Sequence, residues 1–394
     1  MTDIRDIAVI SVARSDYSIL RPVLKKIDTC EGLNLNLIVS GMHLSPEFGM
    51  TVDDIVADGW IVKERIEHLV ASDTPCGLSK SIGLGVIGFA DLFSRYRPDV
   101  LVITGDRFEM LAAAIAAQPF GIPIAHIHGG ETTEGAIDEV FRHSITKMSH
   151  LHFATTEVHK RRIIQLGERS DNVFLSGAPA LDNLLDFEPM AFEAFRDQFN
   201  LKSETRPIVA TYHPETIDFK SNRKNLLAII KVLRDQRRQV FFTASNADTT
   251  GRLINKIVAD ACAENSHFDF KPNMGLNNYY QLLSHAKFMI GNSSSGIIEA
   301  GSFDLPVINV GNRQKGRAHG VNVIHTDCKY SNIQKSIEIV ESEVLMDEIK
   351  KEQNPYFNGG SSQIICNALE NFKITENVLQ KKFNDNFFTH NGSG

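Results

Sequence analysis

The chain has 394 residues, of which 42% are hydrophobic and 23% are charged. This balance argues against a disordered chain and supplies enough apolar side chains for two domain cores. Lys and Arg number 41 against 48 Asp and Glu, so the net charge is −7 and no basic surplus points to a nucleic-acid partner.

The five cysteines are scattered without paired spacing, which argues against a disulfide framework and against a zinc ribbon. The apolar run Ile7–Val12 is too short, and too soon followed by Arg14, for a signal peptide. No stretch has the roughly 18 consecutive apolar residues of a membrane span. We therefore expect a protein of the reducing cytoplasm with no membrane partner.

Short apolar runs alternate with longer amphipathic runs, and the alternation restarts after Pro207. The strands predicted before Pro207 are Ile7–Val12, Asn34–Ser40, Val100–Thr104 and Ile124–Ile127, with helices at Tyr17–Asp28 and Phe108–Gln118. The strands predicted after it are Ile208–Thr211, Gln239–Ala244, Phe288–Gly291 and Val307–Val310, with helices at Asn225–Arg237, Thr250–Cys262 and Ser295–Ser302. Continuous apolar strands between helices predict two doubly wound α/β domains with parallel sheets.

The two predicted domains join within the polar stretch Asp182–Arg206. We assign residues 1–185 to the first domain, 186–360 to the second, 361–380 to a C-terminal helix and 381–394 to a flexible tail. Open parallel sheets bind ligands beyond the carboxyl ends of their strands, so the site is expected in the cleft between the domains.

A G-x-G-x-x-G pattern at Gly83, Gly85 and Gly88 does not predict a dinucleotide site. That fingerprint needs a strand before it and a helix opening after it. The residues before Gly83 form no strand, and the run GLGVIGFADLFSRY is typical of the middle of a helix.

Ionisable residues gather after two strands of the first domain. Asp106 and Arg107 follow Val100–Thr104, where Asp106 could exchange a proton or cap the next helix. The second strand runs into the segment HIHGGE, in which His126 and His128 share one strand face, and Glu131 and Asp138 follow. These residues could hold a metal, but they lack a known zinc spacing, and we favour acid/base chemistry.

Polar motifs also follow the strands of the second domain. His213 follows Ile208–Thr211, where it could bind a pyrophosphate or lie in a surface turn, and Asn246 follows the next strand. The strongest local signal is GNSSSG, residues 291–296, after a buried strand and before a helix. Free N–H groups at a helix N-terminus bind phosphate, and Glu299 one turn later could bind sugar hydroxyls. Arg313 is a plausible phosphate partner.

Two further loops at strand ends carry candidate ligand contacts. Arg14 and Asp16 follow the first predicted strand, and His43 follows the second. An ordinary solvated loop explains these residues about as well as a binding role.

Taken together, these motifs resemble the UDP-N-acetylglucosamine 2-epimerase superfamily, and best its hydrolysing branch from sialic-acid precursor biosynthesis. The motifs are RSDYS, GMHL, GDRFEM, HIHGGE, IDEVFRHSITK, HPE, GNSSSGIIEAGSF and PVINVGNRQKGR. The resemblance implies two Rossmann-like domains in the glycosyltransferase-B arrangement, with the final helix packed on the first domain. It also implies no cofactor, no required metal, and a homodimer or homotetramer.

The implied reaction converts UDP-N-acetylglucosamine to UDP and N-acetylmannosamine through a 2-acetamidoglucal intermediate that takes up water. The residues implied for catalysis are Asp106, Glu131, Asp138, His213 and His128. The residues implied for substrate or UDP binding are Arg14, Asp16, His43, Arg107, Asn246, Ser293, Ser294, Glu299 and Arg313.

One position departs from the family pattern. Relatives often carry a catalytic Glu where this chain has His128, so either Glu131 supplies the second carboxylate or His128 moves the proton itself. Three other activities remain as alternatives: the same reaction on a UDP-2,4-diacetamido-2,4,6-trideoxyhexose, glycosyl transfer from a UDP-sugar, and nucleotide-sugar sensing without turnover.

Overall fold

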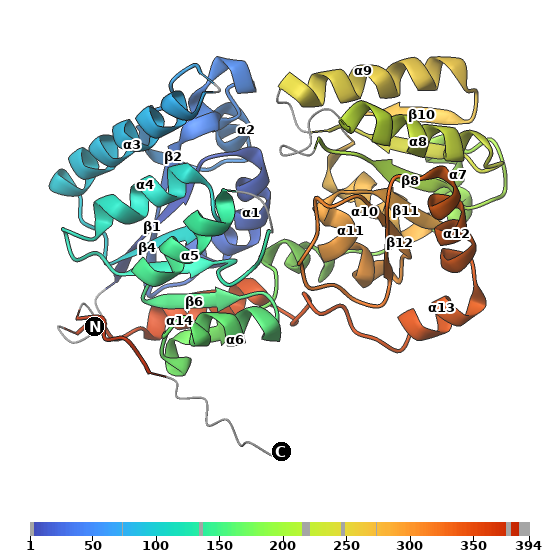
Figure 1. Cartoon of the computed structure of the whole chain (residues 1–394). Coiled ribbons are helices and arrows are strands. Elements are labelled where there is room, and N and C mark those ends of the chain that lie inside the picture. The colour runs from blue at the N-terminus through green and yellow to red at the C-terminus, as the bar shows by residue number, and fades with distance from the viewer. Residues whose placement is uncertain are drawn as a thin grey trace, which may run out of the picture. The chain divides into compact units, whose positions relative to one another are not determined.

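Parallel strands form a separate sheet in each half of the chain in the computed structural model (Figure 1). The structure describes residues 4–72, 74–133, 137–214, 221–245, 249–272, 274–375 and 380–385, without the side chains of residues 249, 250 and 252. The chain divides into two compact units. Unit 1 is Met1–Glu131, Ile137–Leu185 and Asn358–Gly394, and unit 2 is Thr132–Ala136 and Asp186–Phe357.

Unit 1 contains a seven-stranded sheet in the order β3-β2-β1-β4-β5-β6-β7, with every pairing parallel. Its strands are β1 (Arg5–Ser11), β2 (Leu33–Ser40), β3 (Val62–Ile66), β4 (Val100–Thr104), β5 (Ile124–Ile127), β6 (Leu151–Ala154) and β7 (Val173–Leu175). Its helices are α1 (Arg14–Asp28), α2 (Val52–Ala57), α3 (Pro75–Arg95), α4 (Phe108–Ala117), α5 (Asp138–Met148), α6 (Glu157–Gln165) and α14 (Ser361–Asn371). Short 3₁₀ turns are η1 (Gly41–Leu44), η2 (Pro46–Phe48), η3 (Ser170–Asn172) and η4 (Pro179–Leu184).

Helices cover both faces of the unit 1 sheet, as a buried parallel sheet requires. Ile7 and Val9 of β1 pack in one core cluster with α1 and α14, whereas Ala8 and Ile10 pack in another with α3 and α4. The C-terminal helix α14 is therefore part of unit 1, where Arg5 also donates to the carbonyl of Leu369.

Unit 2 contains a six-stranded parallel sheet in the order β10-β9-β8-β11-β12-β13. Its strands are β8 (Ile208–Thr211), β9 (Val240–Thr243), β10 (Phe268–Lys271), β11 (Phe288–Gly291), β12 (Val307–Val310) and β13 (Val323–Thr326). Its helices are α7 (Phe192–Phe199), α8 (Asn222–Arg234), α9 (Thr249–Glu264), α10 (Gly275–His285), α11 (Ser294–Ile298), α12 (Tyr330–Val340) and α13 (Glu343–Ile349), with the 3₁₀ turn η5 (Ala300–Phe303).

Helix α3 contains the rejected G-x-G-x-x-G pattern in its interior, which confirms the prediction that these glycines are helical. Its 21 residues are also long and apolar enough to cross a membrane by length and composition alone, contrary to the prediction that no stretch would be. In unit 1 this helix packs against α4 and buries Phe89, Leu92 and Phe93.

The segment predicted as a flexible tail, residues 381–394, contacts the rest of unit 1 through its described part, residues 381–385. The Lys381 ammonium group donates to the backbone carbonyls of Lys147 and Ser149 and to the Glu168 carboxylate, at 2.5 to 2.8 Å. The Phe383 ring lies over Gly167 and within 4.8 Å of the Lys147 ammonium group. These contacts attach the segment to the end of α5 and to the loop after α6.

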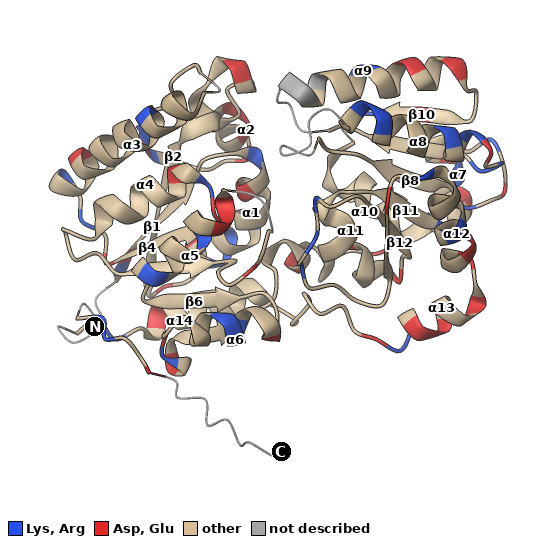
Figure 2. Cartoon of the chain, in the orientation of Figure 1, with Lys and Arg blue, Asp and Glu red and all other residues tan. Residues whose placement is uncertain are grey.

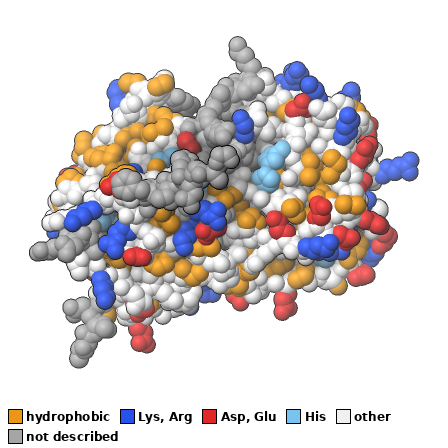
Figure 3. Space-filling model, turned by 60° about the horizontal axis from the view of Figure 1, so that its bottom comes forward, with side chains coloured by type: hydrophobic (Ala, Val, Ile, Leu, Met, Phe, Trp, Pro, Cys, Tyr) orange, Lys and Arg blue, Asp and Glu red, His pale blue; other side chains and the backbone are white. Residues whose placement is uncertain are grey.

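Charged residues of both signs are interspersed along helices and loops (Figure 2). The molecular face in Figure 3 likewise intersperses Lys and Arg side chains with Asp and Glu side chains. This mixture agrees with the slightly acidic composition, 41 Lys and Arg against 48 Asp and Glu.

Candidate active site

The acid/base candidates of unit 1 lie where β4 and β5 end and α5 begins. Asp106 follows β4 through Gly105, whose φ of +74° turns the chain sharply. His128 directly follows β5, and Asp138 is the first residue of α5. Since β4 and β5 are parallel neighbours, their carboxyl ends meet at one edge of the sheet, as predicted from sequence.

Arg142 of α5 connects these residues, and its side chain is almost completely buried. One terminal nitrogen (Nη1) donates to the Glu139 carboxylate at 2.7 Å and to the Glu131 carbonyl at 3.0 Å, and the other (Nη2) donates to the Asp106 carboxylate. Burial alone would lower the pKa of Arg142, but the charges of Asp106 and Glu131 outweigh it and raise that pKa. Sequence reasoning did not assign Arg142 to the site, although its spacing from Glu139 is that of an i, i+3 helix pair.

Asp138 has an environment suited to proton transfer. Burial raises its pKa, and the nearby charge of Asp106 raises it further, while Arg107 and Arg142 oppose the shift. Two carboxyl groups that share a partly desolvated region resist ionising together. A carboxyl group whose pKa is raised in this way is suited to accept and donate a proton.

His128 and Glu131 form a buried pair beside this cluster. The His128 Nδ1 atom lies 2.6 Å from Glu131 Oε1, which also accepts a hydrogen bond from the Thr155 hydroxyl at 3.1 Å. His128 has a left-handed backbone with φ of +65°. The prediction that His126 and His128 share a strand face is therefore wrong, because β5 ends at Ile127 and strand alternation stops there.

His126 has a structural role. Its Nε2 atom lies 2.8 Å from the Gly105 carbonyl and its Nδ1 atom lies 3.2 Å from the Thr146 hydroxyl. Burial lowers its pKa to about 3, so the ring is neutral. Among the residues that the structure describes, no group of three or more His, Cys, Asp or Glu side chains is arranged to hold a metal ion.

Two residues predicted to bind substrate are engaged within unit 1. The Asp16 carboxylate accepts hydrogen bonds from the backbone N–H groups of Val12 and Ala13, both at 2.8 Å, and so caps α1. Both ring nitrogens of His43 contact hydroxyl groups, those of Ser11 at 2.9 Å and Thr51 at 2.7 Å. Burial raises the pKa of Asp16 to about 6 and lowers that of His43 to about 4.

The other two predicted residues of unit 1 are arginines. Arg14 is exposed at the start of α1. Arg107 forms a bidentate pair with the fully buried Glu109, with nitrogen–oxygen distances of 2.8 and 3.1 Å. Burial opposes the charge of Arg107, but Glu109 outweighs it and raises the pKa of the guanidinium.

In unit 2 a buried asparagine links two predicted site residues. The Asn292 side chain accepts from the His213 N–H group at 2.7 Å and donates to the His213 carbonyl at 2.8 Å. The Asn292 carbonyl accepts from Arg313 at 3.0 Å. Burial lowers the pKa of His213 to about 3, and the Arg313 charge contributes, so this imidazole is neutral near pH 7. Sequence reasoning did not single out Asn292.

The GNSSSG segment forms the turn between β11 and α11. Gly291 has φ of +138°, and a Cβ atom there would lie 1.8 Å from the Thr211 carbonyl, so only glycine fits. Ser293 is the N-cap of α11 and Ser294 its first residue. The helix predicted at Ser295–Ser302 is divided into the five-residue α11 and the turn η5.

Glu299 directly follows α11 and is linked to α10. Its carboxylate lies 3.5 Å from the Tyr280 hydroxyl, and burial raises its pKa. The predicted contact Asn246 lies outside the described residues.

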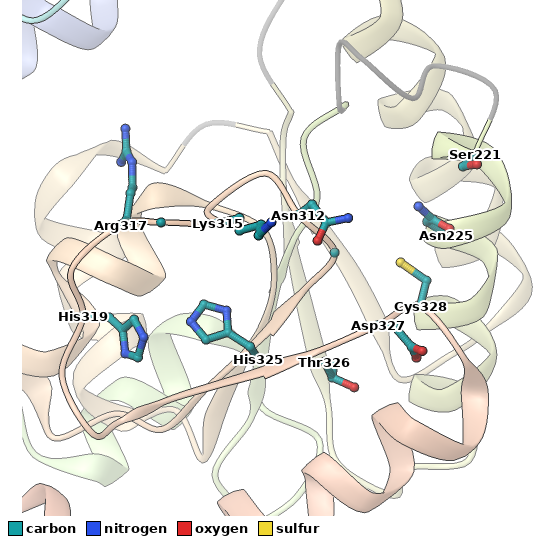
Figure 4. A pocket seen from close by; sticks show the side chains of 12 residues that line it. Ser221, Asn225, Asn312, Lys315, Arg317, His319, His325, Thr326, Asp327 and Cys328 are labelled. Atoms are coloured by element: carbon teal, nitrogen blue, oxygen red, sulfur yellow. The ribbon is translucent and has the colours of Figure 1, made fainter. Parts of the chain in front are cut away.

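Unit 2 also contains a pocket of about 700 Å³ at the carboxyl ends of β12 and β13, in the size range of small-molecule sites (Figure 4). Its polar lining includes Asn312 and Lys315 in the loop that also carries Arg313. The rings of His319 and His325, both in the lining, lie 4.6 Å apart. In Figure 4 the side chains of Asn225 and Cys328 lie across the pocket from Asn312.

Comparisons with known proteins agree on one family. A family model described as UDP-N-acetylglucosamine 2-epimerase matches residues 25–370. The chain is 38% identical to a GDP/UDP-N,N'-diacetylbacillosamine 2-epimerase (hydrolyzing) of Campylobacter jejuni, over 97% of this chain and 99% of that protein. It is 34% identical to a UDP-N,N'-diacetylbacillosamine 2-epimerase (hydrolyzing) of Legionella pneumophila, over 96% of this chain and 99% of that protein. It is 32% identical to the polysialic acid biosynthesis protein P7 of Escherichia coli, over 97% of each.

Solved structures show the same fold. A UDP-GlcNAc 2-epimerase from Neisseria meningitidis bound to UDP-GlcNAc has a TM-score of 0.78 at 17% identity, over 92% of this chain and 99% of that one. The predicted fold class, two Rossmann-like doubly wound domains of the glycosyltransferase-B type, is confirmed.

Proposed function

Because the chain belongs to the UDP-N-acetylglucosamine 2-epimerase family, we propose that it is a hydrolysing 2-epimerase of a UDP-2,4-diacetamido-2,4,6-trideoxyhexose. The observation that carries this choice is the identity of 38% and 34%, over nearly the full chain, to two hydrolysing epimerases named for UDP-N,N'-diacetylbacillosamine. This sugar was the alternative in the sequence analysis, which put UDP-N-acetylglucosamine first.

The reaction is an elimination followed by hydration. A base takes the proton from C2, the C2–H electron pair forms a C1=C2 double bond, and the C1–O bond breaks with its electron pair leaving on UDP. Water then adds, its oxygen to C1 and a proton to C2 on the opposite face, which inverts the C2 configuration. The residues present supply the acids and bases that these steps need.

Each unit supplies a different part of the chemistry. In unit 1, Asp106 and Asp138 exchange protons with the sugar, and the buried Arg142 fixes the Asp106 carboxylate. In unit 2, Ser293 and Arg313 bind the phosphates of UDP, and Glu299 binds its ribose. Neutral His213 can donate a hydrogen bond to the departing diphosphate without a net charge of its own.

UDP-N-acetylglucosamine is the second candidate substrate. Two relatives favour it: the polysialic acid biosynthesis protein P7, and a UDP-N-acetylglucosamine 2-epimerase of Neisseria meningitidis, 30% identical over 96% of this chain. The two substrates differ at C4 and C6 of the sugar, far from the proton transfer at C2. The acid/base residues therefore do not distinguish them.

The test is proton NMR of the purified protein in deuterated water with each nucleotide sugar and no acceptor or cofactor. We expect UDP and a free 2-epimerised sugar deuterated at C2, with a higher kcat/KM for the diacetamido substrate. An Asp106→Asn variant should release UDP at least 100-fold more slowly. Higher kcat/KM for UDP-N-acetylglucosamine would reverse the substrate assignment, and UDP release only with an added acceptor would indicate a glycosyltransferase.

A further inference from the structure

His128 has a conformation and a contact that packing alone does not explain. Non-glycine residues with positive φ are uncommon, and this one, at +65°, is buried directly after a central strand of the sheet. Backbone of this kind persists only where the surroundings fix it, and it concentrates at functional sites. Here it turns the ring out of the strand register and places Nδ1 against the Glu131 carboxylate.

Hydrogen-bond donors fix the protons of this pair. The Thr155 hydroxyl donates its only proton to Glu131 Oε1 at 3.1 Å, so it accepts from Nδ1–H of His159, 2.8 Å away. Arg142 donates to the Glu131 backbone carbonyl, and its positive charge lies close enough to favour the ionised carboxylate. An ionised Glu131 accepts hydrogen bonds only, so Nδ1 of His128 must carry a proton.

The other ring nitrogen of His128 is not occupied by such a contact. His128 Nε2 is buried, and among the described residues it has no hydrogen-bond partner. A buried polar atom without a partner carries a free-energy cost, and at His128 it lies on the ring that contacts the Glu131 carboxylate. An imidazole whose Nδ1 faces a carboxylate and whose Nε2 has no partner among the described residues is the arrangement of a general base.

We propose that His128 and Glu131 form a catalytic dyad in which His128 Nε2 takes the C2 proton of the sugar, and that Thr155 is a positioning residue for Glu131. The inference rests on the proposed function. Nε2 accepts the proton while the C2–H electron pair forms the C1=C2 bond and UDP leaves with the C1–O pair. Glu131 stabilises the resulting imidazolium, which later returns its proton to solvent. The carboxyls of Asp106 and Asp138 are then available to protonate C2 from the other face.

The first test compares His128→Gln, His128→Glu and Glu131→Gln with wild type. We expect kcat for UDP release to fall about 10²- to 10⁴-fold in His128→Gln, with UDP affinity unchanged. His128→Glu should recover part of this loss, because a carboxylate can also accept the proton. In Glu131→Gln kcat should also fall, because a neutral amide stabilises the imidazolium formed in the proton transfer less than a carboxylate does.

The second test uses two buried threonines, Thr155 directly after β6 and Thr104 at the end of β4. Thr155→Val removes the hydrogen bond to Glu131 and should lower kcat about fivefold, the equivalent of one hydrogen bond of about 1 kcal/mol. Thr104→Val is the matched control, because the Thr104 hydroxyl is buried with no partner among the described residues, and kcat should not change. Thermal unfolding and UDP binding verify that all variants are folded.

The outcomes separate the two proposals. Absence of turnover by the wild type on both nucleotide sugars would overturn the proposed function, and the dyad with it. Wild-type turnover together with an unchanged kcat in His128→Gln would overturn the dyad alone. A ¹⁵N spectrum of the ligand-free protein gives an independent readout: a proton on Nε2 rather than Nδ1 of His128 would also contradict the dyad.

Discussion

Arg142→Lys should destabilise unit 1 and slow the reaction although it retains the positive charge. The guanidinium donates to the Asp106 and Glu139 carboxylates and to the Glu131 carbonyl. A single ammonium group on a shorter side chain retains about one of them. Two lost hydrogen bonds, one of them to a charged group, amount to about 3 kcal/mol. The Asp106 and Glu139 side chains are each about a quarter exposed, so water replaces part of the lost hydrogen bonding. We therefore expect the free energy of unfolding to fall by about 2 kcal/mol.

Urea unfolding at pH 7 measures the free energy of unfolding, and UDP release measures kcat. We expect kcat to fall about 10- to 100-fold, because the Asp106 carboxylate loses the group that orients it. The control is Arg161→Lys on α6, whose pairing with Glu157 is solvent-exposed and should change stability by less than about 0.5 kcal/mol. Wild-type stability and kcat in Arg142→Lys would refute the view that the geometry of the guanidinium organises the site.

Three further substitutions test individual residues. His43→Leu leaves the buried hydroxyl groups of Ser11 and Thr51 without this partner. The free energy of unfolding in urea should fall by about 2 to 4 kcal/mol, whereas the affinity for UDP should stay the same. Lost UDP affinity with unchanged stability would instead support the predicted binding role of His43. Burial opposes ionisation of Glu168, but its hydrogen bonds, including that from Lys381, lower its pKa to about 2. The pKa of Glu168 is lower in the folded state, so the ionised carboxylate stabilises the fold above pH 4.5, and this stabilisation is lost as the pH falls toward 2. Between pH 7 and pH 4 the free energy of unfolding of the wild type should fall about 1 kcal/mol more than that of Glu168→Gln. Equal losses in the two proteins would exclude this linkage. Glu299→Gln should weaken UDP and uridine binding alike, by about tenfold in calorimetry, whereas weakening of UDP alone would assign Glu299 to the phosphates.

The strands predicted most directly are continuous apolar runs that are buried on both faces. Val100–Thr104 has every residue buried and therefore forms an unbroken apolar run that sequence alone identifies. The strand β3 was not predicted, because Lys63, Glu64 and Arg65 interrupt its apolar pattern. As an edge strand it pairs with β2 alone, so polar side chains there remain in contact with water.

The sequence could predict that candidate residues follow the carboxyl ends of strands, but not the contacts of the individual side chains. A polar residue after a strand can bind a ligand, or it can form hydrogen bonds with nearby groups of the protein. Both roles give the same sequence pattern. Asp16 and His43 use their polar atoms within unit 1. Arg142 illustrates the reverse case. It lies one turn inside a helix, and only the packing of α5 against the ends of β4 and β5 reveals its contact with Asp106.

The choice between His128 and Glu131 shows most clearly what a linear pattern omits. The sequence analysis treats them as alternatives, because relatives often carry a catalytic Glu at the position of His128. The HIHGGE segment ends in a turn: Gly130 has φ of +75°, and a Cβ atom there would lie 2.5 Å from the His159 carbonyl. Only glycine permits this close approach, which brings Glu131 back to the His128 ring. The two residues thus become parts of one hydrogen-bonded unit, and a change in either should affect the same proton.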